Sequence, residues 1–223
     1  MIKEKDFIEL EYSGRFKDNN ELFDTTSEEE AKKEKIHSQN MQYGPATICV
    51  GQGHLLKGLE KELVGKEIGK ELTINLSAED AFGKKDVKML RQVPLNKFQK
   101  EGIRPIPGMQ VNVDGAIGIV RTVSGGRVIV DFNHPFAGKN VVYRVKVKRK
   151  VEDKAEQISS LVQMIFNIKK DAFSAKVEND VATIEMPKLP DEIKQELTKK
   201  IKWLVSVKDV KFVDMKERVE RQT

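Results

Sequence analysis

Residues 51–65, GQGHLLKGLEKELVG, constrain the fold of this chain more than any other stretch. Leu55, Leu59 and Leu63 recur every four residues among charged positions, which predicts a short helix over 53–63. The sequence on either side, over 3–16 and 70–76, alternates apolar and polar residues with the period of a strand, and 46–50 is an apolar run typical of a buried strand. Residues 27–40 are polar, with acidic and basic side chains spaced for helical pairs, and indicate an exposed helical excursion within a loop.

The glycines of this stretch do not form a phosphate-binding loop. A dinucleotide fingerprint needs a third glycine where this chain has Leu56, and the leucine side chain would block the close packing of helix and strand. Gly53 and Gly58 have the spacing of a Walker loop, but Leu59 replaces the lysine that would reach the phosphates. The helix therefore presents an apolar side, for which core packing is the simplest reading and the one we adopt for Leu63.

The character of the sequence changes twice along the chain. Residues 87–132 contain three prolines and several glycines among short β-rich runs, and Ser124-Gly125-Gly126 is a hairpin signal, so a small β domain is expected there. A final alternating strand over 141–147 belongs by its pattern with the first 85 residues. From 152 the order becomes a helix to 168, strands near 173–177 and 181–186, a helix around 193–204 and a strand at 207–213, which predicts a separate α-β-β-α-β domain with its own core.

The composition predicts a folded protein, with 39% hydrophobic and 34% charged residues. No apolar run approaches the roughly 20 residues of a membrane span, and the N-terminal residues lack a signal peptide, so a cytoplasmic protein without a membrane partner is expected. The net charge is +5, and the basic residues are interspersed with acidic ones along the chain. This pattern favours a solvated surface over nucleic-acid binding. Cys49 is the single cysteine; an internal disulfide is excluded and a buried structural thiol is expected.

Several motifs together resemble the FKBP-type peptidyl-prolyl cis/trans isomerases, in their SlyD-like, long archaeal form. These motifs are Tyr12-Ser13-Gly14, Leu22-Phe23-Asp24, residues 51–60 and 65–76, Asp80-Ala81-Phe82-Gly83 and residues 141–147. The resemblance covers 1–85 and 132–150. Residues 86–131 lie where SlyD-like members carry an insert-in-flap domain, and the last seventy residues match the extra domain of long archaeal members less specifically.

The resemblance implies an α+β fold and three domains. Residues 1–85 and 132–152 would form the isomerase domain, a curved antiparallel sheet around a short helix. Residues 86–131 would form a β-rich inserted chaperone domain. Residues 153–223 would form a C-terminal α-β-β-α-β domain for dimerisation or client binding.

The implied activity is isomerisation of Xaa-Pro bonds in an apolar pocket lined by Tyr12, Phe23, Asp24, Leu55, Leu56, Leu59, Phe82 and Tyr143. The Leu56 N–H would hold a substrate carbonyl, and Asp24 would orient Tyr12. Outside this pattern, Asp24 reads as a turn carboxylate, and Tyr12 and Phe23 as ordinary core. Leu59 replaces a tryptophan frequent in the family, Phe82 a tyrosine, and Ala46 lies near a position often filled by phenylalanine. These departures make the pocket shallower and remove one donor, which bears on tight binding of macrolide inhibitors more than on catalysis.

The expected partners are unfolded or partly folded proteins that contain proline. The resemblance implies that the insert captures them through apolar side chains, about half of which would instead build the insert's own core: Met89, Leu90, Val93, Leu95, Phe98, Ile103, Ile106 and Met109. No cofactor and no metal are expected, because His37, His54 and His134 lack metal-ligand spacing and the chain ends KERVERQT, without the histidine-rich tail of SlyD.

Two other functions stay open. The chain could be a holding chaperone with little isomerase activity, its pocket degraded at Ala46, Leu59 and Phe82. It could instead bind nucleic acid or the ribosome through the C-terminal lysines, although that domain lacks an aromatic stacking pair and a glycine loop. These lysines are Lys199, Lys200, Lys202, Lys208 and Lys211. Self-association or an added client surface is the preferred role for 153–223.

Overall fold

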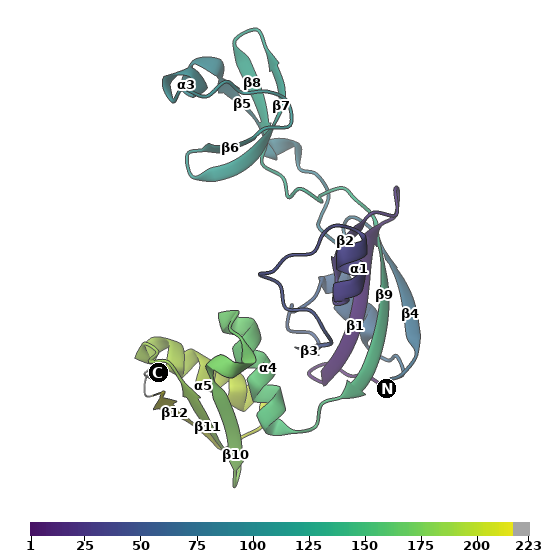
Figure 1. Ribbon diagram of the computed structural model, residues 1–223, viewed down its shortest axis with the longest axis vertical. Helices are drawn as coiled ribbons and strands as arrows, with labels where there is room; N and C mark the ends of the chain where they lie inside the picture. The colour runs from purple at the N-terminus through teal and green to yellow at the C-terminus, as the bar shows by residue number, and fades with distance from the viewer. Residues whose placement is uncertain (216–223) are drawn as a thin grey trace, which may run out of the picture. The chain divides into compact units, whose positions relative to one another are not determined.

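The computed structural model describes residues 1–215 (Figure 1). The KERVERQT ending, from which the lack of a histidine-rich tail was read, lies outside them. The described residues form two compact units, one of residues 1–15, 21–74 and those from 142 onward, and the other of residues 16–20 and 75–141. Three separate sheets with a few helices confirm the predicted α+β class.

The first sheet carries the alternating strands of the sequence. It contains β1 (Phe7–Phe16), β2 (Leu22–Thr25), β4 (Glu71–Leu76) and β9 (Val141–Lys150) in the order β2-β1-β9-β4, and β3 (Ala46–Cys49) pairs with the first half of β1. The pairs β1–β2 and β1–β3 are antiparallel. The late strand β9 thus lies beside β1, as its pattern predicted.

Two short helices accompany this sheet, and both differ from their predicted form. Helix α2 (Lys57–Leu63) begins at Lys57 instead of 53. Gly53 has a φ of 72°, outside the helical range, and the N–H groups of residues 53–55 donate to the side chain of Glu60. Helix α1 (Glu28–Lys33) is capped by Ser27 and carries the expected i,i+4 pair between Glu28 and Lys32. It is not wholly exposed, because Ala31 on its inner side is fully buried.

The C-terminal elements follow the predicted α-β-β-α-β order. They are α4 (Lys154–Phe166), a short 3-10 turn η2 (Lys170–Ala172), β10 (Ser174–Glu178), β11 (Val181–Met186), α5 (Asp191–Val205) and β12 (Asp209–Asp214). The sheet order is β10-β11-β12, and β11 and β12 are parallel because α5 crosses between them. The expectation of a core of its own is wrong in one respect: Phe7 and Cys49 of the first sheet are buried in the same cluster as the side chains of α4 and α5.

The inserted residues form a four-stranded antiparallel sheet. It contains β5 (Leu90–Pro94), β6 (Gln110–Val113), β7 (Ala116–Ser124) and β8 (Arg127–Asp131) in the order β5-β8-β7-β6, preceded by a 3-10 turn η1 (Val87–Met89). Ser124 pairs with Arg127 across the predicted hairpin. Sequence reasoning missed helix α3 (Leu95–Lys100), whose Phe98 packs into the small core with five valines: Val93, Val111, Val120, Val128 and Val130.

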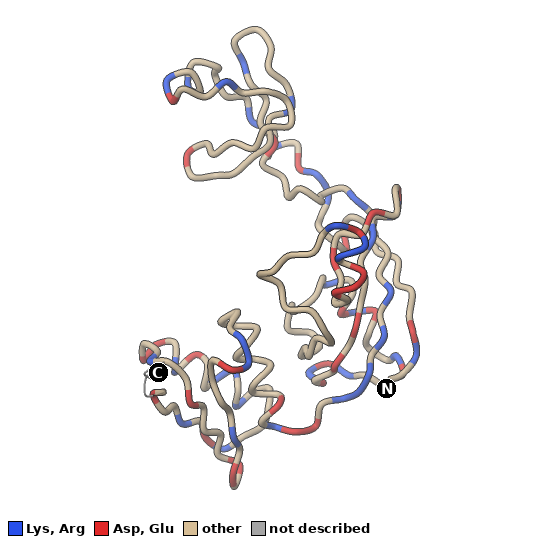
Figure 2. Tube along the Cα trace, in the orientation of Figure 1, with Lys and Arg blue, Asp and Glu red and all other residues tan. Residues whose placement is uncertain are grey.

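Charge is distributed along the whole chain. Figure 2 shows lysine and arginine interspersed with aspartate and glutamate in every part that the structure describes, without one basic tract. Within residues 1–215, no helix has the length and apolar character needed to cross a membrane.

Candidate active site

Three aromatic rings from three strands meet on one side of the first sheet. Strand β1 supplies Tyr12, β2 supplies Phe23 and β9 supplies Tyr143. The ring centroids of Phe23 and Tyr143 are 5.8 Å apart, nearly perpendicular at 86°, and those of Tyr12 and Tyr143 are 5.9 Å apart. Tyr143 is only 3% exposed, so it forms the base of the group. The structure thus brings together three of the predicted pocket residues, of which Tyr12 and Tyr143 are 131 positions apart in the chain.

Gly14 makes this approach of the rings possible. A Cβ added at Gly14 would lie 2.8 Å from the Tyr143 ring and 2.9 Å from the Phe23 ring, closer than any real side chain tolerates. The φ of Gly14 is ordinary, so the requirement is one of space alone. Any larger residue at this position would push the two rings aside.

Asp24 lies beside these rings as a half-buried carboxylate. The Tyr12 hydroxyl and the Thr25 N–H both donate hydrogen bonds to it and lower its pKa, but burial outweighs them and raises the pKa of Asp24 above 3.8. Burial, and secondly the charge of Asp24, raise the pKa of Tyr12 and of Tyr143 above the ordinary tyrosine range. The site therefore holds phenols that resist ionisation next to a carboxyl group whose pKa is raised.

The loop before α2 carries the predicted leucines. Leu55 and Leu56 are half-buried, and Leu59, in the first turn of α2, is fully buried. The Glu60 carboxylate accepts the N–H groups of three successive loop residues, at 3.1, 2.7 and 3.0 Å: Gly53, His54 and Leu55. This role of Glu60 was not predicted, because nothing in its local sequence distinguishes it from the other charged residues of the helix.

The structure gives the immediate surroundings of two further positions noted in the sequence. Phe82 belongs to the second unit, where its ring stacks on His134 at 5.0 Å and meets Phe136 edge-on at 5.2 Å. Its place in the proline pocket stays a prediction. Ala46 pairs with Leu10 at the start of β3 and is half-buried.

The apolar residues of the insert divide between its interior and its surface. Val93 and Phe98 are buried in its core, and Leu95, Ile103 and Met109 pack against that core. Met89 is half-buried. Leu90 and Ile106 are exposed by 42% and 58%, and Val87 and Ile117, which the sequence reading passed over, by 78% and 62%. The exposure of Ile117 on β7 could not be predicted, because the sequence does not show which face of the sheet its side chain occupies until the strand register is known.

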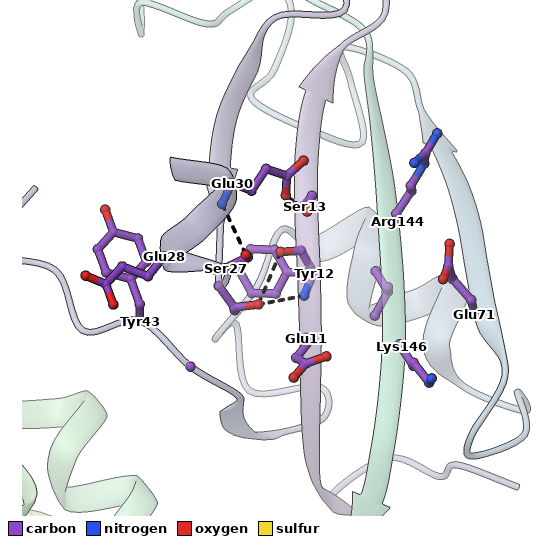
Figure 3. A pocket seen from close by; sticks show the side chains of 13 residues that line it. Glu11, Tyr12, Ser13, Ser27, Glu28, Glu30, Tyr43, Glu71, Arg144 and Lys146 are labelled. Atoms are coloured by element: carbon purple, nitrogen blue, oxygen red, sulfur yellow. Dashed lines mark hydrogen bonds between the residues drawn. The ribbon is translucent and has the colours of Figure 1, made fainter. Parts of the chain in front are cut away.

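A polar hollow of about 600 Å³ lies on the outer face of the first sheet (Figure 3). Glu11 and Ser13 of β1, Arg144 and Lys146 of β9 and Glu71 of β4 contribute to it, together with α1 and Tyr43. Along β9 these outward residues alternate with the buried Tyr143, Val145 and Val147. Tyr12 of the aromatic group also lines this hollow, while most of its other lining residues are charged or polar.

No cluster of three or more histidine, cysteine or acidic side chains suited to a metal ion occurs in residues 1–215. The aromatic site itself offers one carboxylate and neutral phenols, a set suited to binding an uncharged peptide group.

Comparison with known proteins identifies a family for this chain. Residues 1–99 match the description "FKBP-type peptidyl-prolyl cis-trans isomerase", and residues 91–136 match "FKBP26, IF domain". The chain is 30% identical over 148 residues to a short-type peptidyl-prolyl cis-trans isomerase of Methanocaldococcus jannaschii, a match that spans 66% of this chain and 93% of the relative.

Two bacterial relatives are similar over shorter stretches. The isomerase SlyD of Vibrio cholerae is 35% identical over 117 residues, 50% of this chain and 57% of SlyD. An FKBP-type 16 kDa isomerase of Escherichia coli is 31% identical over 107 residues, 46% of this chain and 72% of the relative. The chain belongs to the FKBP-type peptidyl-prolyl cis-trans isomerases.

Proposed function

We propose that the face formed by Tyr12, Phe23 and Tyr143 beside Asp24 receives the proline of Xaa-Pro segments in unfolded or partly folded proteins. We further propose that residues 86–131 capture these clients before a proline reaches the isomerase domain. Isomerase activity follows from membership of the family; the residue roles and the chaperone function are the proposal.

Rotation about an Xaa-Pro bond needs no nucleophile, metal or general base, because no bond is broken. The barrier of about 18–20 kcal/mol comes from amide resonance, and unassisted rotation takes tens to hundreds of seconds. The planar amide is more polar than the twisted one, so a site that removes water raises the free energy of the planar form more. That difference accelerates the rotation. A tenfold gain needs about 1.4 kcal/mol, within what desolvation of one amide can supply.

The arrangement around Asp24 is the observation that carries this proposal. Partial burial of a carboxylate costs free energy unless the carboxylate is well hydrogen-bonded, and burial raises the pKa of Asp24 in spite of its two donors. Strained electrostatics of this kind are typical of functional sites. In the proposed roles, the three rings and the leucines Leu55, Leu56 and Leu59 grip the proline, and Asp24 orients Tyr12. The Leu56 N–H bonds a substrate carbonyl.

The insert supports client binding through its exposed apolar side chains. Val87, Leu90, Ile106 and Ile117 are each more than 40% exposed on a domain with a small core of its own. Exposed apolar side chains that lie close enough to form one patch are typical of protein-binding surfaces. Val93 and Phe98 are excluded from the proposed surface, because they are buried.

We keep the three-domain division as part of the proposal, with 1–85 and 132–152 as isomerase, 86–131 as client-binding insert and 153–223 as a further domain. On the C-terminal domain, Trp203 is 56% exposed and Val213 47% exposed, which favours self-association or an added client surface. Nucleic-acid binding has no specific support within the described residues.

Two rate measurements test the proposal. One follows cis-to-trans conversion of a short Xaa-Pro peptide, and the other follows proline-limited refolding of an unfolded protein. Asp24→Ala should lower both rates. Replacing 86–131 by a tight turn should preserve the peptide rate and lower the refolding rate. If Asp24→Ala left both rates at the wild-type value, the proposed pocket would be wrong; unchanged refolding without 86–131 would remove the chaperone role.

A further inference from the structure

We propose that Glu60 is a positioning residue of the isomerase, which fixes the backbone of residues 53–55 and so presents the N–H of Leu56 to the substrate carbonyl. The inference rests on the proposed function, because that function gives the Leu56 N–H its role. Glu60 does not touch the substrate in this scheme; it acts through the loop.

The hydrogen bonds of Glu60 define one continuous segment. Its two carboxylate oxygens accept the N–H groups of Gly53, His54 and Leu55 at 2.7–3.1 Å, and the residue is only 5% exposed. Bonds from an N–H to a carboxylate are stronger than those between neutral groups. Three of them to one buried side chain hold three consecutive peptide groups in a single orientation.

The next N–H group in the chain, that of Leu56, has no hydrogen-bond partner among the described residues. Leu56 is the N-cap of α2, with extended backbone (φ −53°, ψ 135°) and no side-chain cap. Its carbonyl accepts the Glu60 N–H at 3.0 Å, while its own N–H bonds to nothing among residues 1–215. The Glu60 side chain thus holds the three N–H groups before Leu56, and the Glu60 backbone N–H holds the carbonyl of Leu56 itself, while the Leu56 N–H is left without a partner among the described residues.

The rest of the loop could not keep this geometry without Glu60. Gly51 and Gly53 have positive φ values of 83° and 72°, in a region where glycine has unusual freedom. Apart from Glu60, one side-chain anchor secures the segment: Nδ1 of His54 accepts the Cys49 N–H at 3.0 Å. A flexible, glycine-framed loop held mainly by one carboxylate depends on that carboxylate for its order.

Glu60→Gln tests this dependence with little change in size. Glutamine offers one acceptor oxygen, and its NH₂ would face N–H donors, so at least one loop bond is lost. We expect kcat/KM on a short Xaa-Pro peptide to fall about tenfold, the effect of losing roughly one charge-assisted hydrogen bond. Glu60→Asp keeps the charge and should retain more activity than Glu60→Gln.

Glu30→Gln is the matched control. Glu30 is a half-buried carboxylate of α1 that, like Glu60, has three hydrogen-bond partners. These partners are the side chains of Ser13, Arg15 and Thr25, and none of them belongs to the loop before α2. The Glu30→Gln variant should be less stable than the wild type but, at a temperature where it is folded, equally active. Asp24→Ala, measured in parallel, reports on the pocket itself.

Amide hydrogen exchange and NMR shifts of the wild-type protein give a readout independent of any variant's folding. The amides of 53–55 should be protected without peptide, and the Leu56 amide should become protected and shift only when peptide binds. A Leu56 amide that is protected beforehand, or that does not respond to peptide, overturns the inference.

The activity results separate the two proposals. Loss in Glu60→Gln but not in Glu30→Gln supports the role of Glu60. Loss in Asp24→Ala with full activity in Glu60→Gln overturns the inference and leaves the pocket standing. Equal losses in the two glutamine variants, in proportion to their stability, reduce Glu60 to a structural residue. Full activity in both Asp24→Ala and Glu60→Gln overturns both proposals.

Discussion

The hydroxyl of Tyr12 on β1 donates a hydrogen bond to the carboxylate of Asp24, which lies opposite Gly14 on the paired strand β2. The bond lowers the pKa of Asp24, while burial raises it by more, so that the net shift is upward from 3.8. The charge state of Asp24 thus depends on a partner that itself belongs to the proposed proline site.

Acidification should lower isomerase activity at a higher pH than an ordinary aspartate would allow. If the ionised carboxylate orients Tyr12, kcat/KM falls as the pH drops through the raised pKa of Asp24. Tyr12→Phe removes the hydroxyl that Asp24 orients, so this variant should lose the acid limb. Asp24→Asn should lose about tenfold in activity, or about 1.4 kcal/mol of transition-state stabilisation, and lose this acid limb. A pH–rate profile measured on a short Xaa-Pro peptide checks all three.

Stability supplies the control for Asp24→Asn. Because folding raises the pKa, the ionised carboxylate destabilises the folded state above that pKa, and the penalty disappears as the pH falls below it. The asparagine variant should therefore remain folded at neutral pH, and its loss of activity cannot be attributed to unfolding. An acid limb identical in the wild type and in Asp24→Asn would exclude Asp24 as its source.

Gly14→Ala should damage the aromatic group directly. The new Cβ would lie 2.8–2.9 Å from the rings of Tyr143 and Phe23, which must move apart. Overpacking of this kind destabilises by about 1–3 kcal/mol. Urea unfolding measures the stability, and peptide kinetics at a temperature where the variant is folded should show a lower kcat/KM. Wild-type kinetics in that folded variant would mean that the close approach of the rings is not needed for catalysis.

Gly118→Ala places the same defect in the insert. A Cβ there would lie 2.6 Å from Val130 and 2.8 Å from Phe132, so the four-stranded sheet should lose about 1–3 kcal/mol. Since the insert has its own core, peptide isomerisation should stay at the wild-type rate while proline-limited refolding slows. Comparison with Gly14→Ala makes the pair diagnostic. A loss of peptide activity equal to that of Gly14→Ala would contradict the proposed division of labour.

Local patterns in the sequence predicted most of the fold. The alternation over β1, β4 and β9 and the Ser124-Gly125-Gly126 hairpin depend on neighbours in the chain, so they could be read directly. Helix α3 escaped because its six residues are too few to show a helical period between Pro94 and Gly102. The shared burial of Phe7 and Cys49 with α4 and α5 escaped because it joins segments about 100 or more residues apart.

The site could be predicted only where a family motif fixed it. Tyr12, Phe23, Asp24 and Tyr143 come together as their motifs implied, while Phe82 lies in the second unit and its role is still a prediction. The role of Glu60 as an acceptor for loop N–H groups could not be predicted, because it depends on the loop folding back over the first turn of α2. Gly14 was part of a quoted motif, but its steric role needs the positions of two rings from other strands.

His54 should make the stability depend on pH. Its Nδ1 accepts the Cys49 N–H, which only an unprotonated nitrogen can do. Burial, and secondly Lys200, lower the pKa of His54 below 6.5, against the opposing charge of Glu60. The unfolded state therefore takes up a proton first as the pH falls, so stability declines from about pH 6.5 toward the lowered pKa and levels off below it.

His54→Asn isolates this contribution. An asparagine oxygen can take the place of Nδ1 as acceptor but does not titrate. The difference in free energy of unfolding between wild type and variant should thus shrink as the pH falls from about 8 to 5. Urea denaturation at several pH values measures it. A difference that stays constant over this range would show that His54 does not titrate in this environment.

Cys49 should report on the packing of α4 and α5 against the first sheet. Its thiol is fully buried, donates to the Lys5 carbonyl at 3.6 Å and has its pKa raised by burial from 9.0 to about 12. At pH 8 the thiolate fraction is lower than in the unfolded chain by roughly three orders of magnitude, so a thiol reagent should react with the native protein very slowly.

Ile201→Ala opens a cavity in the shared core, at a cost of about 2–5 kcal/mol, and should speed the reaction by increasing local opening. Ile74→Ala, a buried isoleucine of β4 outside that cluster, is the control. Equal labelling rates in the two variants at matched stability would mean that Cys49 becomes accessible only through global unfolding, and that α5 does not shield it locally.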